Sequence, residues 1–115
     1  MSLKDYITKV NYELKDICLI IKSLINSVIQ IQKINIFHRD IKLGNIVINT
    51  ITNEIRLIDW GMAEFYHPGQ VYSSRVSTLP YKPPELLLEF ECYDMSIDTW
   101  LIGMVFGCLV RLKAF

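Results

Sequence analysis

Apolar residues recur every three or four positions over residues 13–32, the spacing at which side chains share one face of a helix. Polar side chains such as Lys22 and Asn26 fall on the other faces. The pattern predicts a helix from about Glu13 to Gln32, for which Asn11 is a candidate N-cap. Residues 1–12 show no clear period and predict no element. The residues of the apolar stripe are Ile17, Ile21, Leu24, Val28 and Ile31, widened by Ile20 and Ile25.

Two short β-branched runs follow, at residues 46–48 and 55–58. The residues between them, 49–54, are rich in Asn and Thr and favour a turn, so the sequence predicts a small β-hairpin. Asn45 then lies at the start of one strand and Asp59 at the end of the other. These two ends are neighbours in antiparallel strands, so both side chains are expected to reach one metal ion.

Residues 59–85 carry no periodic pattern and contain three prolines in five positions, at 80, 83 and 84. Proline lacks a backbone N–H, so this density excludes regular structure there and predicts a long irregular segment, followed by a short helix that begins at Pro84. Several hydroxyl groups in the segment are candidate phosphate acceptors, although their spacing selects none. They are Tyr72, Ser73, Ser74, Ser77 and Thr78.

A last helix is predicted from Ser96 to about Lys113. Ser96 is a favourable N-cap, and Asp98 in the first turn complements the positive end of the helix dipole. The apolar residues of this helix, Trp100 and Phe106 among them, are expected to belong to the core.

Composition narrows the classes of protein and partner that are expected. The 115 residues suffice for one small domain, half of them are hydrophobic, and the formal net charge is zero. Neither nucleic acid nor a membrane is therefore an expected partner. The longest apolar run, residues 100–110, is too short to cross a bilayer. Three widely spaced cysteines (18, 92 and 108) have no metal-binding spacing and favour reduced thiols in an intracellular protein of the nucleus or cytoplasm.

The chemistry is concentrated in Phe37-His38-Arg39-Asp40-Ile41-Lys42-Leu43-Gly44-Asn45 and in Asp59-Trp60-Gly61. A carboxylate that orients a hydroxyl, a cation that offsets phosphate charge, and an Asn with an Asp for divalent metal are the groups that phosphoryl transfer requires. His-Arg-Asp with Asn five residues after the Asp is the catalytic-loop pattern of protein kinases.

Further motifs follow in kinase order: Pro83-Pro84-Glu85 and Asp98-x-Trp100-x-x-Gly103. The chain resembles the C-terminal lobe of eukaryotic protein kinases, and within them the catalytic (alpha) subunits of casein kinase II. Trp60, where most kinases have Phe, and the run Ala63–Gln70 carry the narrower resemblance. The implied fold is α+β and mainly helical, a partial kinase domain over residues 1–115 with a small β-hairpin.

The resemblance implies a role for each matching residue. Asp40 would orient the substrate hydroxyl, and Lys42 would contact the γ-phosphate of ATP. Asn45 and Asp59 would hold Mg²⁺. Two apolar residues would form the floor of the adenine site, and two basic residues would bind acidic side chains of protein substrates. The first pair is Val47 and Ile58, and the second is Arg75 and Lys82.

Four more residues are implied to support the structure. Arg39 would pair with a phosphorylated residue in most kinases, whereas this family is regarded as active without phosphorylation, with Trp60 contributing through its indole N–H. Asp98 would accept hydrogen bonds from backbone N–H groups of the catalytic loop. Glu85 normally pairs with an arginine that would follow residue 115.

The sequence also departs from the family. Leu79 replaces a third basic residue of the acid-binding site, Leu43-Gly44 replaces Pro-His, and Pro83 replaces Gly. No G-x-G-x-x-G loop and no V-A-I-K strand occur, so the N-lobe and the final helices are expected to lie outside the chain. A regulatory subunit is expected only where an N-lobe exists. Two hypotheses stay open: a serine/threonine kinase, and a non-catalytic remnant or interaction module that is inactive alone.

Overall fold

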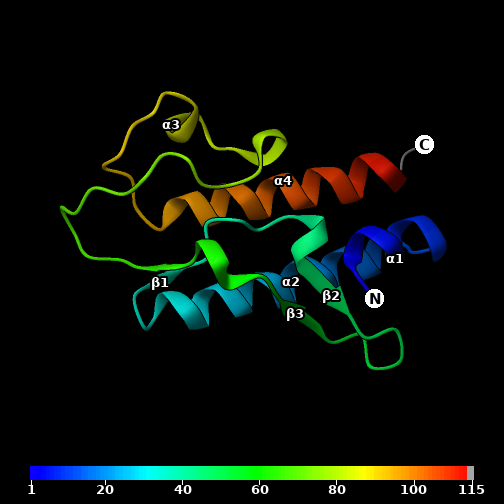
Figure 1. The fold of residues 1–115 in the computed structure, drawn as a ribbon. Coiled ribbons are helices and arrows are strands. Elements are labelled where there is room, and N and C mark those ends of the chain that lie inside the picture. Colours follow the sequence, from blue (N-terminus) through cyan, green and yellow to red (C-terminus); the bar gives the residue numbers. More distant parts are fainter. Residues whose placement is uncertain (114–115) are drawn as a thin grey trace.

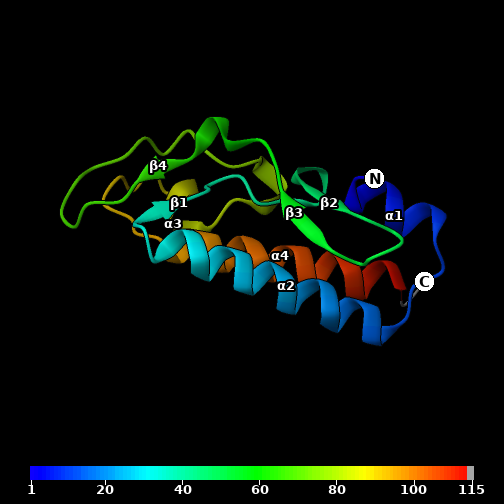
Figure 2. The same ribbon diagram turned by 90° about the horizontal axis from the view of Figure 1, so that it is seen from below.

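The computed structural model describes residues 1–113. Two long antiparallel helices, α2 and α4, pack side by side, and the strands and the irregular segments cover one side of the pair (Figures 1 and 2). The helices are α1 Leu3–Lys9, α2 Leu14–Gln32, α3 Pro84–Leu87 and α4 Ser96–Lys113. The strands are β1 Ile36–Phe37, β2 Ile46–Ile48, β3 Ile55–Leu57 and β4 Glu64–Phe65.

The predicted helix over residues 13–32 is confirmed as α2. Its N-cap is Glu13, which forms a capping box with Asp16, so the expected cap at Asn11 is wrong. The apolar stripe is narrower than predicted, because Ile25 is 40% exposed. The buried residues of α2 are Ile17, Ile20, Leu24 and Val28.

Helix α1 was not predicted. Ser2 caps it by accepting a hydrogen bond from the backbone N–H of Asp5, and Leu3 and Tyr6 are buried. Seven residues hold too few apolar positions for a helical period to be visible. Just before α1, Ser2 forms an isolated β-bridge with Val47, which attaches the start of the chain to β2.

The predicted hairpin is confirmed. Strands β2 and β3 are antiparallel, with Ile46 opposite Leu57 and Ile48 opposite Ile55. A second two-stranded sheet, β1 with β4, was not predicted, and in it Ile36 lies opposite Phe65. Each of these strands has two residues, too few for an alternating pattern. This sheet ties the start of the loop that carries the His-Arg-Asp motif to the segment that follows Asp59.

The predicted short helix at Pro84 is confirmed as α3, and the last helix is confirmed as α4. Ser96 is the first helical residue of α4 rather than its N-cap, and its backbone N–H donates to the carboxylate of Asp94 at 2.8 Å. The expectation that Trp100 and Phe106 belong to the core is wrong, since each is 45% exposed. Only one face of α4 packs inward; its buried apolar residues are Ile97, Leu101, Ile102, Val105 and Leu109.

Two apolar cores support the site. The larger lies between α2, α4 and the β2–β3 hairpin, and it includes Leu24, Ile46 and Leu101. The smaller is rich in aromatic rings and centres on Phe37, whose ring packs edge-on against Tyr72 at 5.1 Å between centroids. Across residues 1–113, no helix has the length and apolar character needed to cross a membrane.

Candidate active site

The loop between β1 and β2 carries the His-Arg-Asp motif, and it is anchored through both the backbone and the ring of His38. Asp98, which is fully buried, accepts hydrogen bonds from the backbone N–H groups of His38 at 2.7 Å and Arg39 at 2.9 Å. The Nδ1 atom of His38 accepts from the backbone N–H of Asp40 at 3.2 Å. Its Nε2 atom therefore carries the ring proton and donates to the carbonyl of Ile58 at 3.1 Å.

Burial raises the pKa of Asp98 above its ordinary value of 3.8. The hydrogen bonds from the backbone of His38 and Arg39 oppose that increase, because they stabilise the ionised form. The contact expected for Asp98 is thus present, and it joins α4 to the loop that carries the His-Arg-Asp motif.

Asp40 lies at the centre of a polar cluster and is only 5% exposed. Its Oδ1 atom accepts a hydrogen bond from Thr78 Oγ1 at 2.9 Å, and its Oδ2 atom lies 3.3 Å from Lys42 Nζ. Lys42 Nζ also donates to Thr78 Oγ1 at 2.7 Å. Two side chains from two segments, Lys42 and Thr78, therefore hold this carboxylate in one orientation.

Asn45 completes the cluster. Its Nδ2 atom donates to both the backbone carbonyl and Oδ2 of Asp40, each at 2.9 Å. With its amide group committed to Asp40, the Oδ1 atom of Asn45 is left as an acceptor for another ligand. The backbone carbonyl of Asn45 accepts from the N–H of Ile58 at 2.9 Å, so the residue before Asp59 lies directly beside Asn45.

Asp59 is exposed and has a left-handed backbone with φ of 59°. Its side chain accepts from the backbone N–H of Gly61 at 3.4 Å. Among residues 1–113, no three His, Cys, Asp or Glu side chains are grouped to hold a metal ion. One amide oxygen and one carboxylate suit a Mg²⁺ ion that keeps water and takes its remaining ligands from phosphate.

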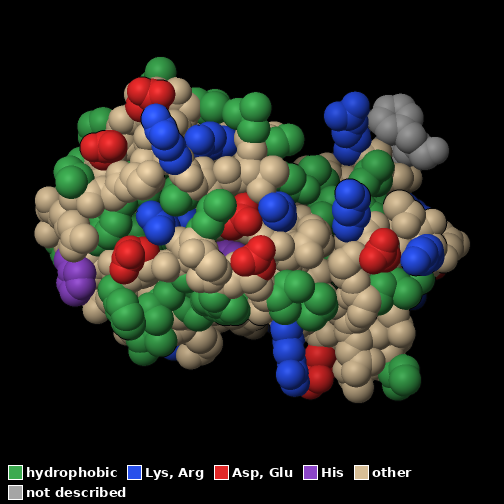
Figure 3. All heavy atoms as spheres, viewed as in Figure 1, with side chains coloured by type: hydrophobic (Ala, Val, Ile, Leu, Met, Phe, Trp, Pro, Cys, Tyr) green, Lys and Arg blue, Asp and Glu red, His purple; other side chains and the backbone are tan. Residues whose placement is uncertain are grey.

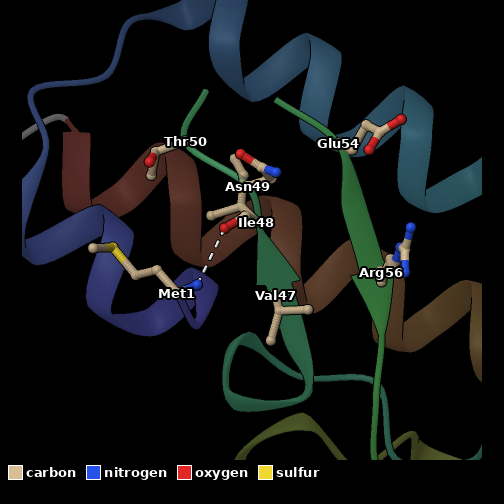
Figure 4. Close-up of a pocket in the computed structure, with 7 residues that line it drawn as sticks. All are labelled: Met1, Val47, Ile48, Asn49, Thr50, Glu54 and Arg56. Carbon is tan, nitrogen blue, oxygen red and sulfur yellow. Dashed lines mark hydrogen bonds between the residues drawn. The ribbon is translucent and has the colours of Figure 1, made fainter. Parts of the chain in front are cut away.

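The two predicted adenine-floor residues differ in surroundings. Val47 is half-buried and lines an open cavity of about 470 Å³ beside the start of the chain, whereas Ile58 is 40% exposed and does not line it. Figure 4 shows this cavity, where the amino group of Met1 donates to the carbonyl of Ile48 at 3.2 Å. Polar and charged residues line the remainder: Asn49, Thr50, Glu54 and Arg56.

The predicted substrate-binding cations lie on the irregular segment before α3. Arg75 is exposed and Lys82 is half-buried. Between them, Leu79 is 72% exposed and immediately follows Thr78, which contacts Asp40. On the face shown in Figure 3, basic and acidic side chains are interspersed rather than gathered into one large region.

The supporting residues are placed as follows. Arg39 donates from Nε to the carbonyl of Met62 at 2.6 Å. The Trp60 ring packs against the ring of His38 at 4.8 Å between centroids, and the expected contribution of its indole N–H stays a prediction. Glu85 is half-buried in the first turn of α3 and lines a cavity of about 200 Å³ with Tyr93.

Two residues of the site were not predicted from the sequence. Thr78 was one of five candidate phosphate acceptors with nothing to select it, and Tyr93 was not singled out. Thr78 lies 38 residues from Asp40, and Tyr93 lies 54 residues from its partner Arg39. Both are in segments without periodicity, so no local signal could have found either.

Comparison with known proteins identifies the family of the chain. The family described as the protein kinase domain matches residues 1–114, and the chain therefore belongs to the protein kinase family. Over 99 residues the chain is 45% identical to a protein of Encephalitozoon cuniculi (strain GB-M1) named "Probable casein kinase II subunit alpha homolog". That alignment covers 86% of this chain and 31% of the relative, so the resemblance to casein kinase II alpha subunits is confirmed over about a third of the relative's length.

Proposed function

We propose that this chain is the C-terminal-lobe part of a serine/threonine protein kinase of the casein kinase II alpha type, which transfers the γ-phosphate of ATP to Ser or Thr of proteins. The observation that carries the proposal is the environment of Asp40. Lys42, Thr78 and Asn45 all contact this nearly buried carboxylate, at distances of 2.9–3.3 Å.

These contacts define what the carboxylate does. Hydrogen bonds to both oxygens of Asp40 hold it in one orientation, so a substrate hydroxyl that approaches it is aligned and gives up its proton to it. The Lys42 ammonium group, 3.3 Å from that carboxylate, offsets negative charge on the phosphoryl group during transfer. Thr78 binds both residues and so brings the irregular segment to the reaction centre.

Asn45 and Asp59 would hold Mg²⁺ through oxygen atoms, and Val47 with Ile58 would lie under the adenine. Bound Mg²⁺ supplies charge neutralisation between the phosphates of ATP. The two hydrogen bonds to Asp40 keep the Nδ2 atom of Asn45 turned toward that residue. The Oδ1 atom of Asn45 would then be free to face the metal ion.

Protein substrates with acidic residues near the phosphoacceptor are proposed from Arg75 and Lys82, which flank the exposed Leu79. Charge-assisted contacts with carboxylates are stronger than neutral ones. A regulatory subunit is proposed only for a protein that also has an N-lobe. An intracellular location, in the nucleus or cytoplasm, is also proposed, and three unpaired cysteines in the described residues support its intracellular part.

A second function is supported by two observations. The sequence contains no glycine-rich phosphate loop and no V-A-I-K lysine, and the chain spans 31% of its relative. Residues 1–115 by themselves are therefore also a candidate for a non-catalytic interaction module of the kinase family.

The test has two arms. The 115-residue chain with Mg²⁺ and labelled ATP should transfer no phosphate above an Asp40→Asn control. The reason is that enclosing the γ-phosphate of ATP between two lobes increases the rate by several orders of magnitude. Residues 38–98 grafted into an intact casein kinase II catalytic subunit should be active, and Asp40→Asn in that graft should abolish the activity. A folded graft that binds ATP but is as slow as its Asp40→Asn form would refute the kinase proposal.

A further inference from the structure

Arg39 is a buried cation whose partners are all neutral. Arg39 as a whole is only 9% exposed. Within residues 1–113 the ion pairs are Lys15 with Glu13 and Lys42 with Asp40, and neither involves Arg39. Burying a charge is costly unless hydrogen bonds replace the lost water, so the neutral groups around this guanidinium have to supply that stabilisation.

Tyr93 is the side-chain partner of this cation. Arg39 Nη1 donates to the Tyr93 hydroxyl at 3.0 Å, and that hydroxyl donates in turn to the backbone carbonyl of Ser73 at 2.6 Å. The Arg39 guanidinium also lies 5.4 Å from the centre of the Phe37 ring. Tyr93 therefore links the catalytic loop to the irregular segment through one continuous chain of hydrogen bonds.

The chemistry of the phenol suits this position. A hydroxyl that accepts from a cation is polarised and becomes a stronger donor, which agrees with the 2.6 Å distance to Ser73. Burial raises the pKa of Tyr93 above 10.0, and the hydrogen bond and charge of Arg39 oppose that increase. The hydroxyl thus keeps its proton at neutral pH and remains able to donate.

Further contacts of Arg39 hold the same segment. Its backbone carbonyl accepts a hydrogen bond from the Ser77 hydroxyl, and its Nε donates to the carbonyl of Met62. Ser77 precedes Thr78, the residue that binds Asp40 and Lys42. The segment is consequently attached at Ser73 through Tyr93 and at Ser77 directly.

We propose that Tyr93 is a positioning residue, which uses Arg39 to hold residues 73–78 against the catalytic loop so that Thr78 reaches Asp40 without any added anion. The importance of this for phosphoryl transfer rests on the proposed function. The attachment itself is a property of the chain that can be measured without activity.

The experiment is hydrogen–deuterium exchange on the full 115-residue chain, with Tyr93→Phe against the matched control Tyr72→Phe. Both variants remove one hydroxyl from the same aromatic cluster, but the Tyr72 hydroxyl bonds to the backbone of Phe65 and His67 rather than to Arg39. We expect Tyr93→Phe to accelerate exchange over residues 73–78 by about tenfold or more while α2 is unchanged. Tyr72→Phe should accelerate exchange around residues 65–67 instead.

A second readout separates positioning from packing. In NMR spectra of arginine-labelled chain, the guanidinium protons of Arg39 should exchange slowly with water in the wild type and at least about fivefold faster in Tyr93→Phe, with Tyr72→Phe at the wild-type rate. Unchanged exchange at residues 73–78 or at Arg39 would overturn the proposal, as would equal acceleration across α2 and α4. Neither measurement depends on phosphate transfer, so failure here and failure of the kinase proposal are distinguishable.

Discussion

The carboxylate of Asp98 accepts a hydrogen bond of 2.7 Å from the backbone N–H of His38, a residue 60 positions earlier in the chain. One side chain at the start of α4 thereby holds the loop that carries the catalytic motif. Asp98 is fully buried, so in the folded chain this contact is shielded from bulk water.

Asp98→Ala should strongly destabilise the chain, because it leaves the buried N–H groups of His38 and Arg39 without acceptors. Each unsatisfied donor costs about 1–3 kcal/mol, so the free energy of unfolding should fall by about 2–6 kcal/mol. Asp98→Asn retains one acceptor and should cost about half as much. Chemical denaturation measures both, and Asp94→Ala is the control at the same helix end. An Asp98→Ala effect no larger than that of the control would show that the anchor contributes little.

The stability of the chain should also depend on pH through Asp98. Its pKa is raised above 3.8 in the folded protein because burial disfavours the charge, so the folded state binds the proton more tightly than the unfolded state. This contribution is present below pH 3.8 and is lost as the pH rises through the folded value. The free energy of unfolding of wild type minus that of Asp98→Asn should therefore decrease as the pH is raised from about 3.8. An increase over that interval would mean that the hydrogen bonds outweigh burial.

Divalent metal should bind weakly at Asn45 and Asp59 in the chain alone. Two oxygen ligands leave most of the coordination sphere to water or phosphate, so we expect millimolar affinity or weaker. Titration with Mn²⁺ should broaden the NMR signals of residues 45 and 59 first. Asp59→Asn should reduce the broadening, whereas Asp94→Asn should not. Equal broadening in both variants would place the ion elsewhere.

Acidic substrates should be preferred, but less strongly than in the rest of the family. Leu79 removes one of three cations, and a charged contact is worth about 1–3 kcal/mol when partly buried and less when exposed. Residues 59–85 can be grafted into an intact casein kinase II catalytic subunit, and kcat/KM measured for peptides with Asp, Ala or Lys after the serine. Leu79→Arg should increase the preference for Asp. If Asp and Lys peptides turn over equally, the roles of Arg75 and Lys82 are wrong.

The chain should self-associate in solution. An apolar groove of about 350 Å³ runs between α2 and α4, and Phe106 and Ile29, which line it, are each more than 40% exposed. Phe106→Ser should shift sedimentation profiles toward monomer. Leu14→Ser, which changes an even more exposed apolar residue that does not line the groove, should not. A wild-type chain that stays monomeric at high concentration contradicts this prediction.

The elements with strong local patterns were predictable from the sequence. Helix α2 followed from its apolar period, the hairpin from two β-branched runs, and α3 and α4 from their starting residues. The candidate catalytic residues Asp40, Lys42 and Asn45 were also evident, because they lie within six consecutive positions. The kinase family followed from the resemblance of this and later motifs to known kinases, and each of these motifs is a local pattern in the sequence.

Contacts between distant segments could not be predicted in the same way. The attachment of Thr78 to Asp40, the chain of hydrogen bonds from Arg39 through Tyr93, and the pairing of β1 with β4 each join residues separated by twenty or more positions. The exposure of Trp100 likewise depends on which face of α4 meets α2. Packing brings these groups together, and since burial and hydrogen-bond partners arise only when distant segments meet, no local pattern in the sequence records them.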